Sequence, residues 1–234
     1  MWAIDQNVDI MSLSWGLPKY SKNIEDALVK AYNRNIVIVA AAANYASRHD
    51  IAFPAKLKDY VICIGSADGN GNISYFAAES EELEKYAAPG EAVLGASIAN
   101  TLRTSPFTET VRFIFAKNDT ERRDGTSVAT PIAAGVAALF IEYTRHTHPE
   151  CKDAGNHKNM LKLFSAMSES QSNQTYRFLK PSRLFSDNDP EGKIKDILDA
   201  SKSYSLFRVD DFLESREADG DLQRKKCTGS VDIH

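Results

Sequence analysis

The apolar residues in the first third of the chain fall into uninterrupted runs. Two of these runs are IVIVAAAA at 36–43 and YVICIGSA at 60–67. Runs of this length, rich in β-branched residues, are typical of strands that are covered on both faces of a parallel sheet. A shorter segment, VDIMSLSW at 8–15, predicts another strand ahead of them.

A helix is predicted between the first two strands. The segment 23–33 places Ile24, Ala27, Leu28 and Ala31 on one face at helical spacing. We interpret WAIDQNV, at the start of the chain, as the end of another helix. Strand, helix, strand, loop and strand in this order predict an α/β domain with a parallel sheet.

A turn is predicted where DGNGN begins at Asp68, because Asn-Gly between two strand-like runs is a strong hairpin signal. The same segment partly matches a calcium-binding loop, with Asp68, Asn70 and Asn72 alternating and Glu79 at the twelfth place. That loop requires glycine at the sixth place, where this chain has Ile73. We therefore favour the hairpin.

The pattern is weaker further along the chain. We interpret Ala87–Val93 as a turn into a short strand, and 97–124 as a long, polar, irregular segment. DNDPEG at 187–192 is a polar break, and KIKDILDA directly after it predicts a short amphipathic helix. We therefore expect one domain over 1–186 and a charged, partly helical or disordered extension over 187–234.

Composition narrows the function classes. The 234 residues are 43% hydrophobic, as in globular proteins, and the net charge of −4 argues against a nucleic-acid partner. Three widely spaced cysteines predict no disulfide framework, which favours a reducing, cytoplasmic or otherwise intracellular compartment. The N-terminus lacks the basic residues of a signal peptide. The apolar stretch Ala133–Ile141 is too short to span a bilayer, so we expect no membrane partner.

Ser127 carries the clearest chemical signal, within GTSVATP at 125–131. Proline is tolerated in the first turn of a helix, so Pro131 predicts that Ser127 lies at a helix N-terminus. Free N–H groups and the helix dipole favour developing negative charge there. The serine is therefore either a helix cap or a nucleophile. It is not the elbow of an α/β hydrolase, which needs glycine where this chain has Ala129.

Three segments match one family in the same order. They are MSLSWG at 11–16, IVIVAAAAN at 36–44 and GTSVATP at 125–131. Together they closely resemble the subtilisin-like serine peptidases, whose serine segment is Gly-Thr-Ser-x-Ala-[Ser/Thr]-Pro. The resemblance extends from Met1 to about His148, and more loosely to about Phe185. It implies an α/β, three-layer subtilisin-like fold with a mainly parallel central sheet, here N-terminally truncated.

The resemblance also implies peptide-bond hydrolysis through an acyl-enzyme. Ser127 would be the nucleophile, and the Asn44 side chain with the Ser127 backbone N–H would hold the oxyanion. The substrate-binding edge and pocket wall would be formed by Ser14, Trp15, Gly16, Ala41, Ala42 and Ala43. Ala43 stands where the family usually has glycine, so its methyl would narrow the pocket or demand a different backbone angle. The implied partner is a protein or peptide substrate, with no cofactor and no metal.

A serine nucleophile requires a general base, and none of the three matching segments contains one. The family supplies a histidine held by an aspartate, both ahead of MSLSWG, and this chain has neither Asp-[Ser/Thr]-Gly nor His-Gly-Thr. Its own histidines are poor substitutes, and His49 is expected in a loop. A zinc cluster would need His146, His148, Cys151 and His157, whose spacing fits no common zinc site.

Three interpretations therefore stand beside one another. The chain is the C-terminal portion of a longer peptidase, with the missing N-terminal part of its own domain as a partner. Alternatively, it is a catalytically inactive pseudo-peptidase that binds peptides or proteins. As a third possibility it is a sedolisin-type peptidase, which would use a glutamate base and an aspartate in the oxyanion hole. Asn44 argues against the third, and we interpret the chain as the first.

Overall fold

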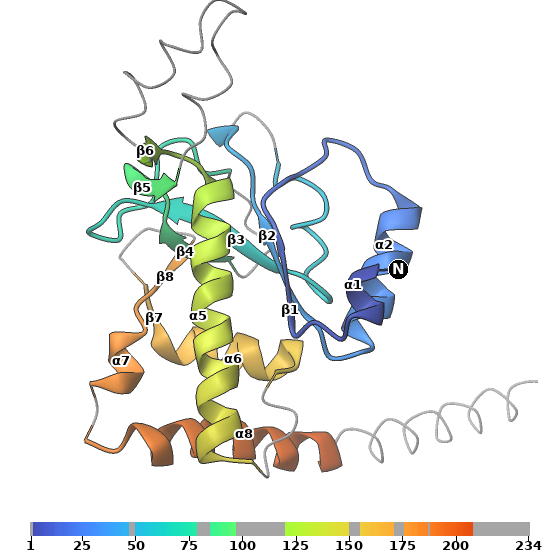
Figure 1. Ribbon diagram of the computed structural model, residues 1–234, viewed down its shortest axis with the longest axis vertical. Helices are drawn as coiled ribbons and strands as arrows, with labels where there is room; N and C mark the ends of the chain where they lie inside the picture. Colours follow the sequence, from blue (N-terminus) through green and yellow to red (C-terminus); the bar gives the residue numbers. More distant parts are fainter. Residues whose placement is uncertain are drawn as a thin grey trace, which may run out of the picture.

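The computed structural model contains a central sheet with helices on both faces (Figure 1). It describes residues 2–46, 50–78, 85–96, 120–149, 155–170, 176–186 and 188–207. The strands are β1 (Ile10–Leu13), β2 (Val37–Ala41), β3 (Ile62–Ala67), β4 (Lys85–Pro89), β5 (Val93–Ala96), β6 (Thr120–Arg123), β7 (Ser168–Ser170) and β8 (Tyr176–Leu179). The helices are α1 (Trp2–Asp5), α2 (Lys22–Tyr32), α5 (Thr126–Thr147), α6 (His157–Met167), α7 (Ser182–Phe185) and α8 (Pro190–Phe207).

Most of the central sheet is parallel. Over the described residues its strand order is β1-β2-β3-β4-β8-β7, while β5 and β6 form a separate antiparallel ladder. The pairs from β1 to β8 are parallel, and β7 runs antiparallel to β8 at one edge. A mainly parallel sheet between helices is the α/β arrangement that the sequence predicts, so this expectation is confirmed.

The strands in the middle of the sheet are buried on both faces, which explains their uninterrupted apolar sequences. Every residue of β2 and of β3 is buried. Val37 and Val39 belong to the core on the α5 side, whereas Ile38 belongs to the core on the α2 side. Helix α2 contributes Leu28 and Ala31 to that second core, as its spacing predicts.

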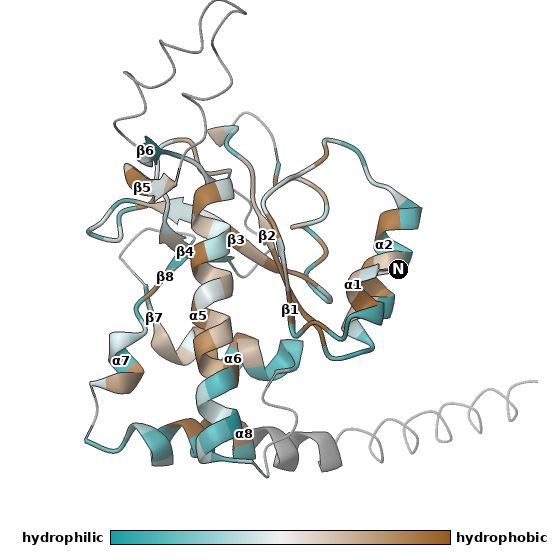
Figure 2. Cartoon of the chain, in the orientation of Figure 1, coloured by the Kyte–Doolittle hydropathy of each residue, from teal (hydrophilic) through white to brown (hydrophobic). Residues whose placement is uncertain are grey.

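Helix α5 lies along one face of the sheet and contacts β1, β2, β3 and β4 (Figure 1). Ala129, Ala133 and Ala137 recur at every fourth position and are fully buried, so small side chains line the contact. Figure 2 shows that α5 becomes hydrophilic toward its C-terminal end. By length and composition α5 is the described helix that could cross a membrane, but a helix at the core of a domain has the same composition.

Two segments differ from the sequence-based expectation. Ala87–Pro89, expected as a turn, belongs to β4, a central strand in which Lys85 through Ala88 are buried. Lysine and proline are depleted in central strands, which hid β4 from a pattern analysis. Part of the expected irregular segment 97–124 is also a strand, because β6 pairs with β5. Residues 97–119 lie outside the described residues.

The turn at Asp68 is confirmed as a hairpin. Ala67 and Ile73 form an antiparallel bridge across it. The Asp68 carboxylate accepts hydrogen bonds from the backbone N–H groups of Asn70 and Asn72 and from the Asn72 side-chain amide. These bonds lower the pKa of the Asp68 carboxyl, the side-chain bond from Asn72 having the largest effect. The Asp68 carboxylate therefore stabilises the turn by accepting hydrogen bonds within it.

The start of the predicted C-terminal extension packs against the domain. In α8, Ile194 is fully buried and Leu198 is 2% exposed, and both belong to the core that includes α5 and α6. Residues 208–234 lie outside the described residues. A domain boundary between 186 and 187 stays a prediction.

Buried His157 makes stability depend on pH. The residue is 4% exposed and packs edge-on against Tyr32, with ring centroids 5.5 Å apart. Burial lowers the pKa of His157 to about 4, against roughly 6.5 for the unfolded chain. The neutral ring therefore stabilises the fold fully above pH 6.5, and this contribution is lost as the pH falls toward 4. Between pH 7 and pH 4 the parent should lose about 3 kcal/mol more unfolding free energy than His157→Phe.

Urea unfolding at a series of pH values measures this difference. His146→Gln is the matched control, because the His146 side chain is 77% exposed. It should leave the pH profile of the parent unchanged. Parallel profiles for the parent and His157→Phe would show that His157 does not titrate in this range.

Candidate active site

Asn44 and Thr126 join the carboxyl end of β2 to the start of α5. The Asn44 Oδ1 accepts hydrogen bonds from the backbone N–H and from the Oγ1 of Thr126, both at 2.9 Å. The Thr126 Oγ1 also accepts a bond from the Ala43 N–H at 3.3 Å. Since its oxygen is fully engaged, the Asn44 amide has only its Nδ2 donors left for a further partner.

Gly125 brings that amide close to Ser127. A β-carbon at Gly125 would lie 3.0 Å from the Asn44 Nδ2 and 3.3 Å from the Ser127 Oγ. The donor and the hydroxyl therefore border one small space in front of the helix. Gly125 has φ 138° and ψ 157°, a conformation essentially restricted to glycine. Its N–H donates to the carbonyl of Gly90 at 2.8 Å. This bond ties Gly125 to the residue that directly follows β4.

Ser127 is the second residue of α5 and is half-buried. Its backbone N–H is among the first four of the helix, which have no acceptor within it and lie at the positive end of the dipole. Pro131 is the sixth residue of α5, so the expectation that it lies in the first turn is wrong. Because proline has no N–H, the helix tolerates it there by leaving the Ser127 carbonyl without its usual partner.

The segment Ser14–Gly16 follows β1 directly and is exposed. The ladder between β1 and β2 ends where Leu13 pairs with Ala40. Trp15 is 42% exposed, which leaves much of its ring open to solvent. Ala52 lies between the predicted edge and wall, because a β-carbon at Gly16 would meet the Ala52 methyl at 2.6 Å and the Ala52 N–H donates to the Ala42 carbonyl.

The three alanines of the predicted wall differ in exposure. Ala41 is 4% exposed and Ala42 is fully buried, so their methyl groups belong to the interior. Ala43 is half-buried and has φ 101°, in the left-handed region that favours glycine. The sequence predicted that Ala43 would either narrow the pocket or adopt a different backbone angle, and the structure shows the unusual angle.

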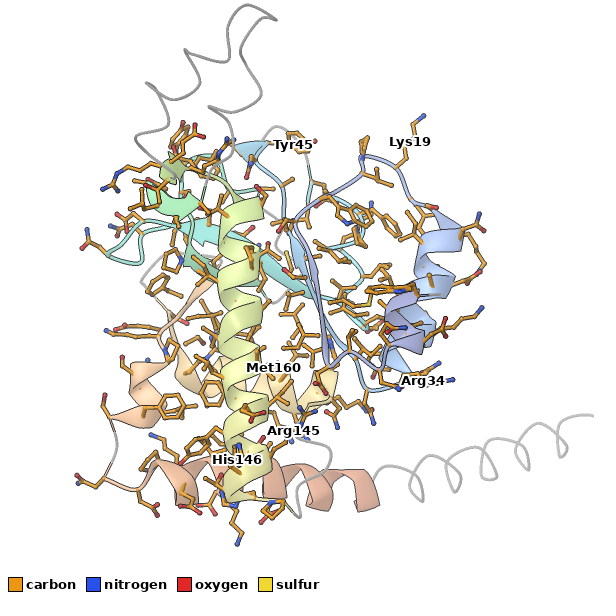
Figure 3. The ribbon with its side chains drawn as sticks, in the orientation of Figure 1. Lys19, Arg34, Tyr45, Arg145, His146 and Met160 are labelled. Carbon is orange, nitrogen blue, oxygen red and sulfur yellow. The ribbon has the colours of Figure 1, made fainter. Side chains whose placement is uncertain are left out.

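The site lies at one end of the molecule. Tyr45, directly after Asn44, lies at the end where α5 begins, whereas Arg34 and His146 lie at the opposite end (Figure 3). His146 is about 28 Å further along the helix than Ser127 at 1.5 Å per residue. It contacts Glu142 at 2.9 Å, one turn away.

The other described histidines are also committed elsewhere. The Nε2 of His148 contacts the Glu191 carbonyl oxygen at 3.2 Å, and His157 is buried against Tyr32. His49, Cys151 and His234 lie outside the described residues. Within the described ranges no three metal-ligating side chains come together.

Comparison with known proteins identifies the family. The family described as "Subtilase family" matches residues 1–175. The chain belongs to the subtilase family. Over 143 residues it is 34% identical to subtilisin DY of Bacillus licheniformis, a match that covers 60% of this chain and 45% of that protein. Over 156 residues it is 33% identical to the thermostable alkaline protease of Halalkalibacterium halodurans, covering 66% of this chain and 37% of that protein. The chain thus spans less than half the length of these two subtilases.

Solved structures agree on the fold. A mutant of the protease domain of PatA is similar with a TM-score of 0.60 and 24% identity, over 82% of this chain and 62% of that chain. The self-cleaved protease domain of PatA gives a TM-score of 0.53 and 26% identity, over 70% and 56% of the two chains. The subtilisin-like fold and the family expected from the sequence are therefore confirmed. The roles of single residues in this subtilase stay predictions.

Sequence analysis missed the contribution of Thr126. Its place directly before Ser127 in the serine motif was the available signal. However, its partner Asn44 lies 82 positions earlier, and no local pattern reports a hydrogen bond over that separation. Gly90 was missed for the same reason, since its contact with Gly125 exists only in the folded subtilase.

A pair of glycine substitutions tests the geometry of the site. Gly125→Ala forces a methyl group into the space between Asn44 and Ser127 and onto a backbone angle that alanine avoids. We expect a loss of about 1–3 kcal/mol in unfolding free energy. Gly135→Ala, in the same helix, places its new methyl more than 4 Å from every described atom outside the adjoining helix backbone and its two chain neighbours. This control should gain roughly 0.5–1 kcal/mol, because alanine favours helix over glycine. Urea unfolding measures both, and a tolerated Gly125→Ala would contradict the described site.

Proposed function

We propose that this chain is the C-terminal portion of a subtilisin-like serine endopeptidase domain that hydrolyses peptide bonds through an acyl-enzyme. Ser127 Oγ attacks the scissile carbonyl, and the carbonyl oxygen becomes an oxyanion. The Asn44 Nδ2 and the Ser127 backbone N–H donate to that oxyanion. The observation that carries the proposal is the shared position of the Asn44 Nδ2 and the Ser127 Oγ around Gly125, 3.0 and 3.3 Å from one point.

The helix dipole adds to this chemistry. Negative charge that develops at the carbonyl oxygen faces the first turn of α5, where the helix has its positive end. The Asn44 Nδ2, which follows β2, and the Ser127 backbone N–H, which belongs to α5, then both donate to the oxyanion. Because both are fixed before substrate binds, they need little reorganisation during the reaction.

Substrate binds along the edge formed by Ser14, Trp15 and Gly16, as an added strand. Backbone groups of an exposed sheet edge supply affinity in this kind of recognition. The wall opposite is the backbone of Ala41 to Ala43, since the first two methyl groups are buried. The half-buried Ala43 is the wall residue whose side chain can meet substrate.

Catalysis requires a base from outside this chain. We propose that a polypeptide with the family's aspartate and histidine segments packs beside β1. Within the described residues β1 pairs on one side only, and its side chains are half-buried or exposed. Leu139 of α5 is 67% exposed, and α5 contacts β1, so this helix also offers apolar surface to a partner.

The chain alone should therefore be inactive. Without a base, the Ser127 hydroxyl stays protonated at neutral pH and attacks poorly. The purified chain should hydrolyse fluorescent casein no faster than its Ser127→Ala variant. Turnover that Ser127→Ala abolishes would show that the chain contains a base of its own.

A fusion with the aspartate and histidine segments of a subtilisin-like domain should be active. In this fusion, Asn44→Ala should lower kcat by about 10²–10³ with little change in KM, because its bond forms mainly in the transition state. That range is the one known for subtilisin itself and is transferred here to Asn44. Asn44→Asp should be at least as poor, since a carboxylate repels the developing charge. Near-normal kcat for Asn44→Ala would place the donor elsewhere.

A second candidate function is a pseudo-peptidase that binds peptides, favoured by the absence of a described histidine near Ser127. It predicts an inactive fusion together with peptide binding by the chain, detectable as a fluorescence change that Trp15→Phe abolishes. A sedolisin-type peptidase is less favoured, because relatives such as subtilisin DY are subtilisins and our proposed oxyanion residue is Asn44, where a sedolisin would use an aspartate.

A further inference from the structure

Ala43 and Asn44 form a backbone segment that is held away from its relaxed conformation. Ala43 has φ 101°, which costs free energy for any residue that has a β-carbon. Its surroundings must therefore impose the angle. On one side, the Ala43 carbonyl accepts a hydrogen bond from the Ala78 N–H at 3.3 Å. On the other side, the Ala43 N–H donates to the Thr126 Oγ1.

Thr126 directs its hydroxyl and its backbone N–H at this segment, while its backbone carbonyl accepts from the Thr130 hydroxyl. It is 1% exposed, so water does not compete for them. Its hydroxyl accepts from the Ala43 N–H and donates to the Asn44 Oδ1, while its backbone N–H donates to the same oxygen. Three hydrogen bonds from a single buried residue thus fix both the peptide before Ala43 and the orientation of the Asn44 amide.

We propose that Thr126 is a positioning residue, which holds the strained Ala43–Asn44 segment so that the Asn44 Nδ2 faces Ser127. The inference rests on the proposed function of Asn44 and extends it to a residue that need not touch substrate. When the Thr126 hydroxyl is absent, Ala43 relaxes toward negative φ and the amide turns away from the oxyanion position. The consequence is particular to this chain, because glycine in place of Ala43 has no strain to release.

The first test uses the chain itself and measures Tm with the side-chain amide NMR signal of Asn44. Thr126→Val removes the hydroxyl at nearly constant shape, and Thr126→Ser keeps it. Thr126→Val should lower Tm by about 2–4 °C and shift the Asn44 signal, whereas Thr126→Ser should stay close to the parent in both. An unchanged Asn44 signal in Thr126→Val overturns the proposal.

The second test asks whether strain at Ala43 is the reason. Ala43→Gly should keep or raise Tm, and Thr126→Val should cost less in the Ala43→Gly background than in the parent. If Thr126→Val alone does not fold, the double variant still decides the test. The proposal requires the double variant to fold, because glycine at position 43 removes the strain. An equal loss of Tm in both backgrounds, or a lower Tm for Ala43→Gly alone, contradicts the proposal.

The third test is kinetic and uses the fusion with the aspartate and histidine segments. Thr126→Val should lower kcat roughly tenfold at constant KM, about the effect of one hydrogen bond. It should cause no further loss in an Asn44→Ala background, and Thr126→Ser should restore kcat. Additive losses would assign Thr126 a role apart from Asn44. An inactive parent fusion would contradict the proposed function, while the Tm and NMR results would still decide the positioning role.

Discussion

The fold depends on how closely α5 approaches the sheet. A helix and a sheet can pack at short distance only where the side chains between them are small, and α5 places Ala129, Ala133 and Ala137 there. The contact spans four parallel strands, so it fixes the axis of the helix relative to all of them. The position of the first turn, and with it Ser127, follows from this packing. A larger residue in the row would move the serine as well as disturb the core.

The candidate site is assembled where one element ends and another begins. Asn44 lies three positions after the end of β2, and Ser127 is the second residue of α5. Gly125 and Gly90 permit the backbone to come this close. Thr126 then decides which end of the Asn44 amide faces the serine. Rigid elements set the coarse geometry, and a few buried hydrogen bonds set the fine geometry.

Sequence patterns predicted the parts of this structure that depend on local chemistry. The apolar runs of β2 and β3 predicted buried strands, and the serine motif predicted a helix N-terminus at Ser127. The patterns did not predict β4, because Lys85 and Pro89 are unusual in a central strand and only tertiary packing places them there. The position of Pro131 within the helix was also not predicted, since it lies in the second turn of α5 and not in the first, where proline is favoured. The left-handed residue Ala43 donates its N–H to Thr126, which is remote in sequence, so no local pattern predicts its angle.

The separation between Asn44 and Thr126 has a consequence for the order of folding. Their hydrogen bonds join residues 82 positions apart, and β3 and β4 lie between them in the chain. Closing a loop of this length costs entropy that only the packed sheet and helix offset. We therefore expect Asn44 and Thr126 to meet late, after the central strands and α5 have come together. An incompletely folded chain therefore holds Asn44 and Ser127 without the hydrogen bonds that bring them together.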